Sequence, residues 1–374
     1  MSNKKRIAII THGGIGGGYQ AQGIPELMQL VSRLANDFDI TVFSLTQVSK
    51  GFIPPHYTVK TVPLKDETNL YIRLFFLLLI LLKTHILKPF SLFQAYWGFP
   101  GGVLAAIMGK LSGKPVVTTF KGAEVVDLPT IHYGLWSSKR MRWLLKQVTS
   151  HTDCVVAHTQ YYLEKIKASG LPYKQLTIIY GGIDTSEIPD NITKLLTPPY
   201  QFFHAANLNL VKDQTTLLHA FKMLSTQIDC RLHIVGFDTL HGQIQQLSED
   251  LGLSKNVIFH GMLPYKALQT FYQRADIFLL TSLSESQALV INEAMANGCV
   301  VCGTRVGLLA DLEDKATLAV EIQNAKDLAD KVLALLQNET EYKALQAFGK
   351  EWSLKHDINY TVKAYTDLYH QLIQ

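Results

Sequence analysis

The chain has 374 residues, of which 47% are hydrophobic and 18% are charged. This composition excludes an intrinsically disordered protein, and the length predicts two domains that are each large enough to bury a core. The net charge of +4 is unevenly divided, because residues 1–188 carry +9 and residues 189–374 carry −5. We therefore expect the first half of the chain to face an anionic surface or substrate.

The first residues and the cysteines both indicate a reducing, cytoplasmic location. Lys4, Lys5 and Arg6 lead into an apolar run of only four residues, which is too short for a signal peptide. The four cysteines lie in apolar stretches and are interpreted as packing residues. Cys299 and Cys302 have the spacing of a metal or redox motif, but a second pair is missing and they lie in a predicted buried strand. We expect no metal site.

Short apolar runs alternate with helical patterns through the first half of the chain. The predicted strands are residues 6–10, 40–45, 92–96, 116–119, 153–157 and 176–179. The predicted helices are a segment ending near residue 35 and residues 103–111 and 161–168. Strands that alternate with helices are typical of a parallel, doubly wound sheet.

A glycine-rich loop, residues 13–18, follows the first predicted strand. Glycine permits positive φ angles and a close approach of backbone to a ligand, so Gly16 and Gly17 are candidate ligand contacts. The alternative is a relaxed dinucleotide-binding motif that begins at Gly16. That motif needs an acidic residue near the end of the second strand, which here ends Phe43-Ser44-Leu45, so a nicotinamide cofactor is disfavoured.

The pattern restarts in the second half of the chain. Residues 189–200 are rich in proline and lack a clear period, which predicts a linker. The predicted strands that follow are residues 202–205, 231–236, 257–260, 277–281 and 299–303. The predicted helices are residues 217–224, 243–251, 268–274 and 288–297. A second doubly wound sheet is therefore expected.

Two carboxylates, Glu285 and Glu293, stand eight positions apart in this second half. Glu285 lies on the loop after an apolar strand, and Glu293 lies about one turn inside the following helix. Backbone N–H groups at the start of that helix, at Gln287, Ala288 and Leu289, suit a phosphate. One acid in the loop, one in the helix and an anion site between them fit a sugar nucleotide.

This segment resembles the E-x7-E signature of the retaining family 4 glycosyltransferases, which have the GT-B fold. The residues that agree with the family pattern are Glu285, Glu293, Ala294, Met295, Ala296, Gly298 and Val301. The chain departs from the pattern at Gln287–Ala288 and at Val300. The resemblance implies an α/β protein of GT-B architecture, in which two doubly wound Rossmann-like domains face each other across a cleft.

The resemblance also implies a domain organisation. Residues 1–188 are expected to form an acceptor-side domain, residues 189–200 the linker and residues 201–350 a nucleotide-sugar-binding domain. Residues 351–374 are expected to form a C-terminal helix that returns to the first domain. Its expected apolar contacts are Trp352, Tyr360, Tyr365, Leu368 and Leu372.

The resemblance assigns roles to residues of the second domain. Glu293 is expected to accept hydrogen bonds from the ribose, and Glu285 from hydroxyls of the donor sugar. Lys212 is expected to neutralise the donor diphosphate together with the backbone N–H groups of residues 287–289. Asn207 stands where the family usually has arginine, which weakens the grip on the diphosphate because an amide lacks the charged fork.

Three further positions follow from the resemblance. Lys121 stands where the family has a histidine that contacts the donor sugar, and it can still donate to a hydroxyl or a phosphate. Gly16 and Gly17 are expected near the donor phosphates, and Gly261 in a loop that borders the base. The expected catalytic residues are thus Lys212, Glu285 and Lys121, although each lysine can alternatively be a solvated surface residue.

The function implied is a retaining transferase that moves a sugar from a nucleotide-diphosphate sugar, with UDP favoured, to a glycan or lipid-linked acceptor in cell-surface polysaccharide synthesis. The donor is a substrate, and neither a cofactor, a metal nor a nucleic acid is expected. Two alternatives stay open. One is a sugar-nucleotide epimerase on the same fold, and the other is a degenerate homologue that binds nucleotide or membrane without catalysis.

Residues 70–93 are unusually apolar, and residues 74–82 contain no polar side chain. This run is shorter than the about 20 residues of a spanning helix. One interpretation is an interfacial helix that makes peripheral contact with an anionic membrane on its cytoplasmic face. The other is a helix buried in the first domain. The basic residues that flank the run are Arg73, Lys83, His85 and Lys88.

Overall fold

The computed structural model describes residues 4–16, 23–189, 194 and 196–374. The chain divides into two compact units, each built around a parallel sheet. Unit 1 comprises Met1–Asp184 and Ile358–Gln374, and unit 2 comprises Thr185–Asp357. The division therefore precedes the expected linker, and the return to unit 1 comes later than the expected residue 351.

Unit 1 contains a seven-stranded sheet with the order β3-β2-β1-β4-β5-β6-β7, in which every pairing is parallel. Its strands are β1 (Arg6–Thr11), β2 (Asp39–Ser44), β3 (Thr58–Thr61), β4 (Leu92–Tyr96), β5 (Val116–Thr119), β6 (Cys154–Ala157) and β7 (Gln175–Ile178). Successive side chains of a strand point to opposite faces. Ile7 and Ile9 of β1 accordingly join one hydrophobic cluster, and Ala8 and Ile10 join another.

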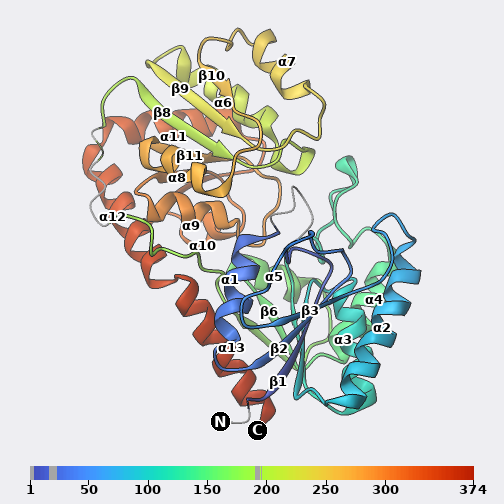
Figure 1. The fold of residues 1–374 in the computed structure, drawn as a ribbon. Helices are drawn as coiled ribbons and strands as arrows, with labels where there is room; N and C mark the ends of the chain where they lie inside the picture. The colour runs from blue at the N-terminus through green and yellow to red at the C-terminus, as the bar shows by residue number, and fades with distance from the viewer. Residues whose placement is uncertain (1–3, 17–22, 190–193, 195) are drawn as a thin grey trace. The chain divides into compact units, whose positions relative to one another are not determined.

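Helices cover both faces of this sheet (Figure 1). They are α1 (Pro25–Leu34), α2 (Leu70–Leu87), α3 (Gly101–Ser112), α4 (Lys139–Ser150), α5 (Gln160–Ala168) and α13 (Ile358–Ile373), with a 3-10 turn at Pro129–Ile131. α1 and α13 pack on the face that carries Ile7, whereas α2 and α3 pack on the face that carries Ala8. α4 packs beside α3. This two-sided burial is why the strands read as continuous apolar runs.

Unit 2 contains a six-stranded parallel sheet with the order β10-β9-β8-β11-β12-β13. Its strands are β8 (Tyr200–Ala205), β9 (Cys230–Val235), β10 (Val257–Phe259), β11 (Ile277–Leu280), β12 (Val300–Thr304) and β13 (Thr317–Val320). Its helices are α6 (Gln214–Ser225), α7 (Gln243–Asp250), α8 (Tyr265–Arg274), α9 (Leu289–Ala296), α10 (Leu308–Asp311), α11 (Ala325–Gln337) and α12 (Glu339–Lys355), with a 3-10 turn at Leu210–Lys212. The predicted elements of both halves are present, and the prediction omitted β3, β13 and the helices α4, α10, α11 and α12.

The prediction of a single returning helix over residues 351–374 is wrong. The chain forms two helices, because α12 ends at Lys355 and α13 starts at Ile358. Trp352 belongs to α12 in unit 2, where it stacks on His356 with ring centroids 4.1 Å apart. α13 alone enters the core of unit 1, and its Tyr369 donates to Gln94 Oε1 of β4 over 3.1 Å.

Candidate functional site

An ion pair joins two loops at the carboxyl edge of the unit 2 sheet. The loop after β8 carries Lys212, and the loop after β11 carries Glu285. Lys212 Nζ pairs with Glu285 Oε1, to which Ser282 Oγ also donates over 2.7 Å. The side chains of Lys212 and Glu285 are only 23% and 12% exposed, so Lys212 is not a solvated surface lysine. Both loops leave the same edge because β8 and β11 are adjacent parallel strands.

Backbone contacts hold the same two loops together. Thr281 Oγ1 donates to the carbonyl oxygens of Lys212 and Asp213 over 3.2 and 2.9 Å. The N–H group of Leu283 donates to the carbonyl oxygen of Val211 over 2.8 Å. The ion pair therefore rests on a hydrogen-bonded framework and not on two freely moving side chains.

A buried histidine at the end of β8 supports the loop that carries Lys212. His204 Nδ1 lies 2.8 Å from the carbonyl oxygen of Leu279, which can only accept, so this nitrogen carries the proton. His204 Nε2 then accepts from Gln214 Nε2 over 3.2 Å, and Gln214 also donates to the carbonyl of Asn207 over 3.1 Å. Burial lowers the pKa of His204 to about 4, which keeps the ring neutral at neutral pH.

Asn207 and Gly261 lie at the same edge, on either side of the loop after β9. Asn207 is exposed, and its Oδ1 accepts the N–H of Phe237 over 3.3 Å. Gly236 must be glycine, because a Cβ at this position would lie 1.8 Å from the carbonyl oxygen of Ala206. The N–H of Gly236 donates to the carbonyl of Gly261 over 2.9 Å, and Gly261 has a φ of +65°. The side chain of Asn207 thus braces the loop after β9.

The start of α9 has a constrained backbone. Ala288, its N-cap residue, has a φ of +67°, which few residues other than glycine adopt, and no side chain of the described residues caps the helix. The carbonyl of Gln287 accepts the N–H of Leu308 over 3.1 Å. Gly307 packs on the same turn, where a Cβ would lie 2.8 Å from the carbonyl oxygen of Gln287. The turn is therefore held from the β12 side, and α9 starts at Leu289 and not at Ala288.

Glu293 lies about one turn inside α9 and is desolvated. Tyr272 Oη donates to Glu293 Oε2 over 2.7 Å. Burial raises the pKa of Glu293 to about 7, although hydrogen bonds from Tyr272 and Tyr265 act in the opposite direction. Burial and the adjacent carboxylate raise the pKa of Tyr272 well above its usual range, so the tyrosine remains the donor. Further donors from a ligand would favour the ionised form of Glu293.

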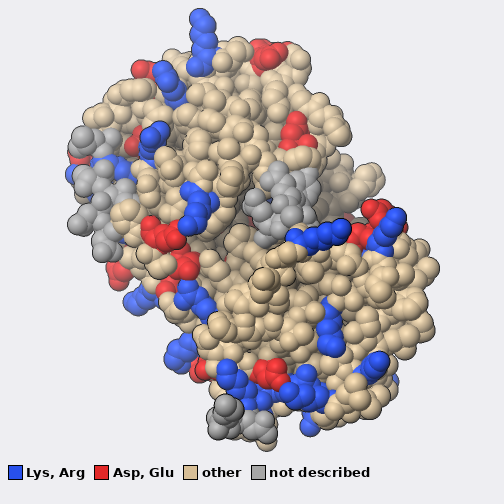
Figure 2. Space-filling model, viewed as in Figure 1, with Lys and Arg blue, Asp and Glu red and all other residues tan. Residues whose placement is uncertain are grey.

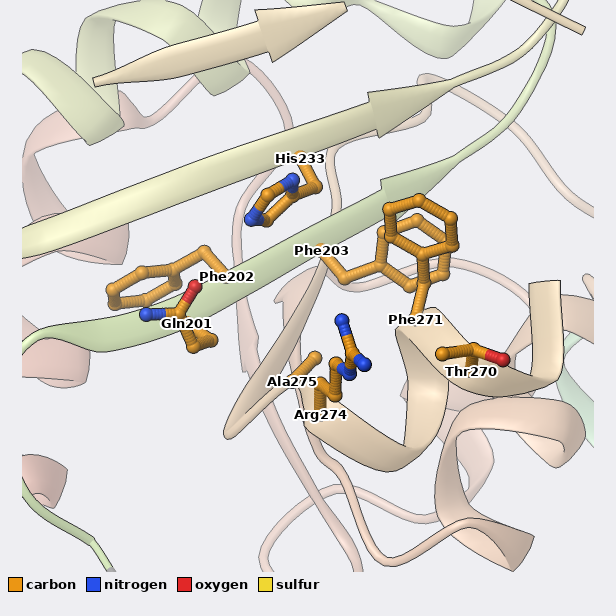
Figure 3. Close-up of a pocket in the computed structure, with 8 residues that line it drawn as sticks. All are labelled: Gln201, Phe202, Phe203, His233, Thr270, Phe271, Arg274 and Ala275. Atoms are coloured by element: carbon orange, nitrogen blue, oxygen red, sulfur yellow. The ribbon is translucent and has the colours of Figure 1, made fainter. Parts of the chain in front are cut away.

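Unit 2 also contains a cavity of about 370 Å³ against the sheet face that α8 covers (Figure 3). The rings of Phe203 and Phe271 stack there with centroids 5.4 Å apart. The residues that line it are Gln201, Phe202, Phe203, His233, Thr270, Phe271, Arg274 and Ala275. Gln201 and Phe202 lie near the start of β8, whereas Lys212 follows its end. The cavity is therefore distinct from the edge that carries the two glutamates.

In unit 1, Lys121 is held by two buried side chains. It follows β5, and its Nζ lies 3.2 Å from Glu26 Oε2 and 3.2 Å from His158 Nε2. Glu26 lies in the first turn of α1, His158 follows β6, and the ring of Tyr96 at the end of β4 lies 5.7 Å from the ammonium. These residues gather at the carboxyl edge of the sheet, where doubly wound proteins bind ligands.

The surroundings of Lys121 fix its hydrogen bonding. Burial, and then the charge of Lys121, lower the pKa of His158 to about 3, and its Nδ1 donates to the carbonyl of Ile179 over 2.8 Å. The neutral Nε2 can therefore accept from the ammonium. Glu124 is buried and accepts the N–H of Gly122 over 2.9 Å and the hydroxyl of Tyr162 over 3.1 Å. At 14% exposure, Lys121 is also not an ordinary solvated lysine.

The glycine-rich loop is described as far as Gly16, and Gly17 lies outside the described residues. Gly16 has a φ of +55°, and a Cβ there would lie 2.2 Å from the ring of Phe52. Its carbonyl accepts the N–H of Ser49 over 2.7 Å. Gly16 is thus required for packing against the segment after β2.

Two protein families match successive parts of the chain. Residues 27–187 match the family described as Glycosyltransferase Family 4, and residues 187–352 match the one described as Glycosyl transferases group 1. The chain belongs to the family 4 glycosyltransferases. The four free cysteines of this glycosyltransferase are all buried.

Two relatives and one solved structure are similar to this glycosyltransferase. N-acetyl-alpha-D-glucosaminyl L-malate synthase from Bacillus anthracis is 24% identical over 67% of this chain and 66% of its own length. The putative colanic acid biosynthesis glycosyltransferase WcaL from Escherichia coli is 23% identical over 74% of this chain and 70% of its own length. HepE from Anabaena, solved in complex with UDP and glucose, covers 98% of this chain and 100% of that chain with a TM-score of 0.76 at 17% identity. The predicted fold, two Rossmann-like α/β domains of the GT-B class, is confirmed.

Sequence reasoning missed the residues that position the expected site. Ser282 donates to Glu285, Tyr272 donates to Glu293, and His204 accepts from Gln214 at the start of α6, but none of the three belongs to the motif. Of these three residues, Ser282 could have been predicted from the sequence, since it stands three positions before Glu285. The partners of Lys121 in this glycosyltransferase had no local signal, because Glu26 lies 95 positions away in the chain.

Replacing Lys121 by Met tests how this lysine supports unit 1. Lys121→Met leaves the buried Glu26 without its cation, and we expect the free energy of unfolding to fall by about 3 kcal/mol. Lys121→Met/Glu26→Gln removes both charges and should recover most of that loss. The measurement is urea unfolding, with Lys110→Met, at an exposed lysine of the same unit, as the control. Single and double variants that are both as stable as the control would contradict this prediction.

Proposed function

We propose that this glycosyltransferase moves a sugar from a UDP-sugar to a glycan or lipid-linked acceptor. The reaction would take place in the cytoplasm, as a step in the synthesis of a cell-surface polysaccharide. The observation that carries the proposal is the arrangement at one edge of unit 2, where Lys212 pairs with Glu285 and α9 begins between Glu285 and Glu293. The UDP and glucose complex of HepE and the name of the WcaL relative support the choice of donor and pathway class.

The proposed reaction retains the configuration of the sugar and needs no metal. The bond between the anomeric carbon and the diphosphate oxygen breaks, and the acceptor oxygen bonds to the anomeric carbon on the same face. The acceptor proton passes to the departing diphosphate. In this scheme Lys212 and the N–H groups of residues 287–289 stabilise the charge that develops on the diphosphate. This charge stabilisation takes the place of a protein nucleophile.

The two glutamates are proposed to accept hydrogen bonds from different parts of the donor. Glu285, in contact with Lys212, would accept from hydroxyls of the sugar. Glu293, desolvated beside Tyr272, would accept from the two ribose hydroxyls. The ribose would thereby add donors to those of Tyr272 and Tyr265, which makes this contact selective for a nucleotide over free phosphate.

The remaining predicted contacts stay proposals of lesser weight. Gly261 would border the base through its backbone, and Asn207 would contribute by bracing the loop after β9. Gly16 keeps its proposed role near a phosphate. Lys121 would donate to a substrate hydroxyl or phosphate, oriented by Glu26 and His158.

The pKa of Glu293 gives the proposal a pH dependence. Ribose hydroxyls donate to the ionised carboxylate, and the pKa of Glu293 is raised to about 7. Binding is therefore fully supported above that pKa and is lost as the pH falls through it, by up to about tenfold in affinity per pH unit. We expect UDP titrations from pH 8 to pH 5.5 to show this loss.

Glu293→Gln is the control for that titration. The variant should bind UDP more weakly at pH 8, and the ratio of its affinity to that of the wild type should approach one as the pH falls. The titration of the UDP phosphate affects binding to both proteins equally, so it cancels in the ratio of their affinities. Equal affinities at pH 8 would contradict the ribose contact, and tighter binding of GDP or ADP would contradict UDP as the nucleotide.

Lys212→Ala tests the proposed charge stabilisation. We expect turnover to fall by about 10²- to 10³-fold, because the variant removes a cation from the developing diphosphate charge. UDP release from the donor sugar measures turnover, and NMR of the product measures the anomeric configuration, which should match that of the donor. Lys255→Ala, at an exposed lysine of unit 2, is the matched control. Unchanged turnover in Lys212→Ala would contradict this role.

A further inference from the structure

Helix α2 of unit 1 is apolar on its outer side as well as on its inner side. It is long and apolar enough to cross a membrane by length and composition alone, with a mean hydropathy of 2.0, and only 17% of it is buried. Its inner side consists of Arg73, Leu77 and Leu81. The exposed apolar residues of the helix are Tyr71, Ile72, Phe75, Phe76, Leu79, Ile86 and Leu87. Their spacing of three and four positions forms a stripe along one side.

The inner side ties α2 to the rest of unit 1. The buried guanidinium of Arg73 donates to the carbonyl oxygens of Leu45 and Asp66 and pairs with the Asp66 carboxylate at 3.2 Å. Leu77 and Leu81 belong to the hydrophobic core that β1 and β4 share. Exposing this side to lipid would leave the buried charge of Arg73 without its partners. The helix therefore presents its outer stripe while remaining part of the domain, and the alternative of a fully buried helix is wrong.

Three of the four basic residues that flank the stripe in the sequence do not supply an unpaired positive charge beside it. Arg73 is buried as described above, and Lys88 pairs with Asp39 at 3.1 Å. His85 accepts the N–H of Phe90, and burial together with the charge of Lys114 lowers its pKa. Lys83 alone of the four is an exposed cation without an ion pair among the described residues.

Helix α4 supplies the missing positive charge. The guanidinium of Arg140 lies 5.3 Å from the ring centroid of Tyr71, which joins the start of α4 to the start of α2. Lys139, Arg142 and Lys146 lie on the same helix, and Trp143 is 60% exposed among them. Both α2 and α4 lie beside α3 (Figure 1). An exposed tryptophan beside basic side chains is typical of a surface that meets lipid headgroups.

The three helices of this surface carry no acidic side chain. Residues 68–123 and 128–152 contain no aspartate or glutamate, although they include α2, α3 and α4. Figure 2 shows a broad uncharged area over these helices, interrupted by lysine and arginine side chains. An apolar stripe bordered by cations complements an anionic bilayer, which offers both acyl chains and negative headgroups.

We propose that the outer stripe of α2 and the basic residues of α4 dock unit 1 on the surface of an anionic phospholipid bilayer. The rings of Phe75, Phe76 and Trp143 would enter the boundary between headgroups and acyl chains, about 5–10 Å deep. The cations of α4 would remain at the level of the headgroups. This site goes beyond the proposed sugar transfer, because it depends on no residue of unit 2.

Flotation with lipid vesicles tests the proposal on the full chain. We expect binding to vesicles of phosphatidylglycerol and phosphatidylcholine at low salt, and much weaker binding to phosphatidylcholine alone. Phe75→Glu/Leu79→Glu should abolish flotation, whereas Met223→Glu/Leu354→Glu, at exposed apolar positions of unit 2, should not. These substitutions lie on exposed side chains, so circular dichroism should show folded variants.

The basic side chains are tested separately. Lys139→Gln/Arg142→Gln/Lys146→Gln should weaken binding by about fivefold per charge, or on the order of a hundredfold in total. Lys255→Gln/Lys315→Gln/Lys326→Gln, in unit 2, is the matched control. Brominated lipids should quench tryptophan fluorescence in the wild type and less in Trp143→Phe.

Three results would overturn the proposal. They are no flotation of the wild type with anionic vesicles at low salt, equal binding to neutral and anionic vesicles, and equal effects of the unit 1 and unit 2 variants. A concentration-dependent dimer without vesicle binding, lost in Phe75→Glu/Leu79→Glu, would assign the stripe to a second copy of the chain instead.

Discussion

The ion pair between Lys212 and Glu285 is the contact on which the geometry of the unit 2 edge depends. It joins the loop after β8 to the loop after β11, and Thr281 and Leu283 bond the same loops through the backbone. α9 follows directly from the second loop, and the turn before it is held separately, because the carbonyl of Gln287 accepts the N–H of Leu308. The ion pair and this turn together define the edge at which α9 starts.

The two glutamates of the motif differ because their surroundings differ. Glu285 faces an ammonium and a serine hydroxyl, so its negative charge is compensated within the protein. Glu293 faces tyrosine hydroxyls and apolar side chains, so its ionisation is costly until a ligand supplies further donors. The spacing of eight residues places one in a loop and the other in a helix, and the environment then separates their chemistry. In the proposed complex, the sugar and diphosphate of the donor meet the charged environment of Glu285 and Lys212, and the ribose meets the environment of Glu293.

Much of the fold could be predicted from the sequence because buried parallel strands such as β11 and β12 leave continuous apolar runs. The edge strand β3 could not, since its residues are mostly half-buried. The break between α12 and α13 also escaped prediction, because the residues between the two helices, His356 and Asp357, include no proline or glycine. The motif gave Glu285 and Glu293 through local spacing. Tyr272 and His204 depend on which strands become neighbours, and a single sequence carries little information on that pairing.

Hydrogen exchange with and without UDP tests most directly whether a nucleotide occupies the edge that Lys212 and Glu285 form. We predict protection of residues 206–213 and 281–296, since these two loops and the start of α9 would surround the diphosphate and the ribose. Glu293→Gln should reduce that protection at the same UDP concentration. Protection confined to the segments that line the cavity beside α8, residues 201–203 and 270–275, would contradict this assignment, as would no protection at a saturating concentration of UDP.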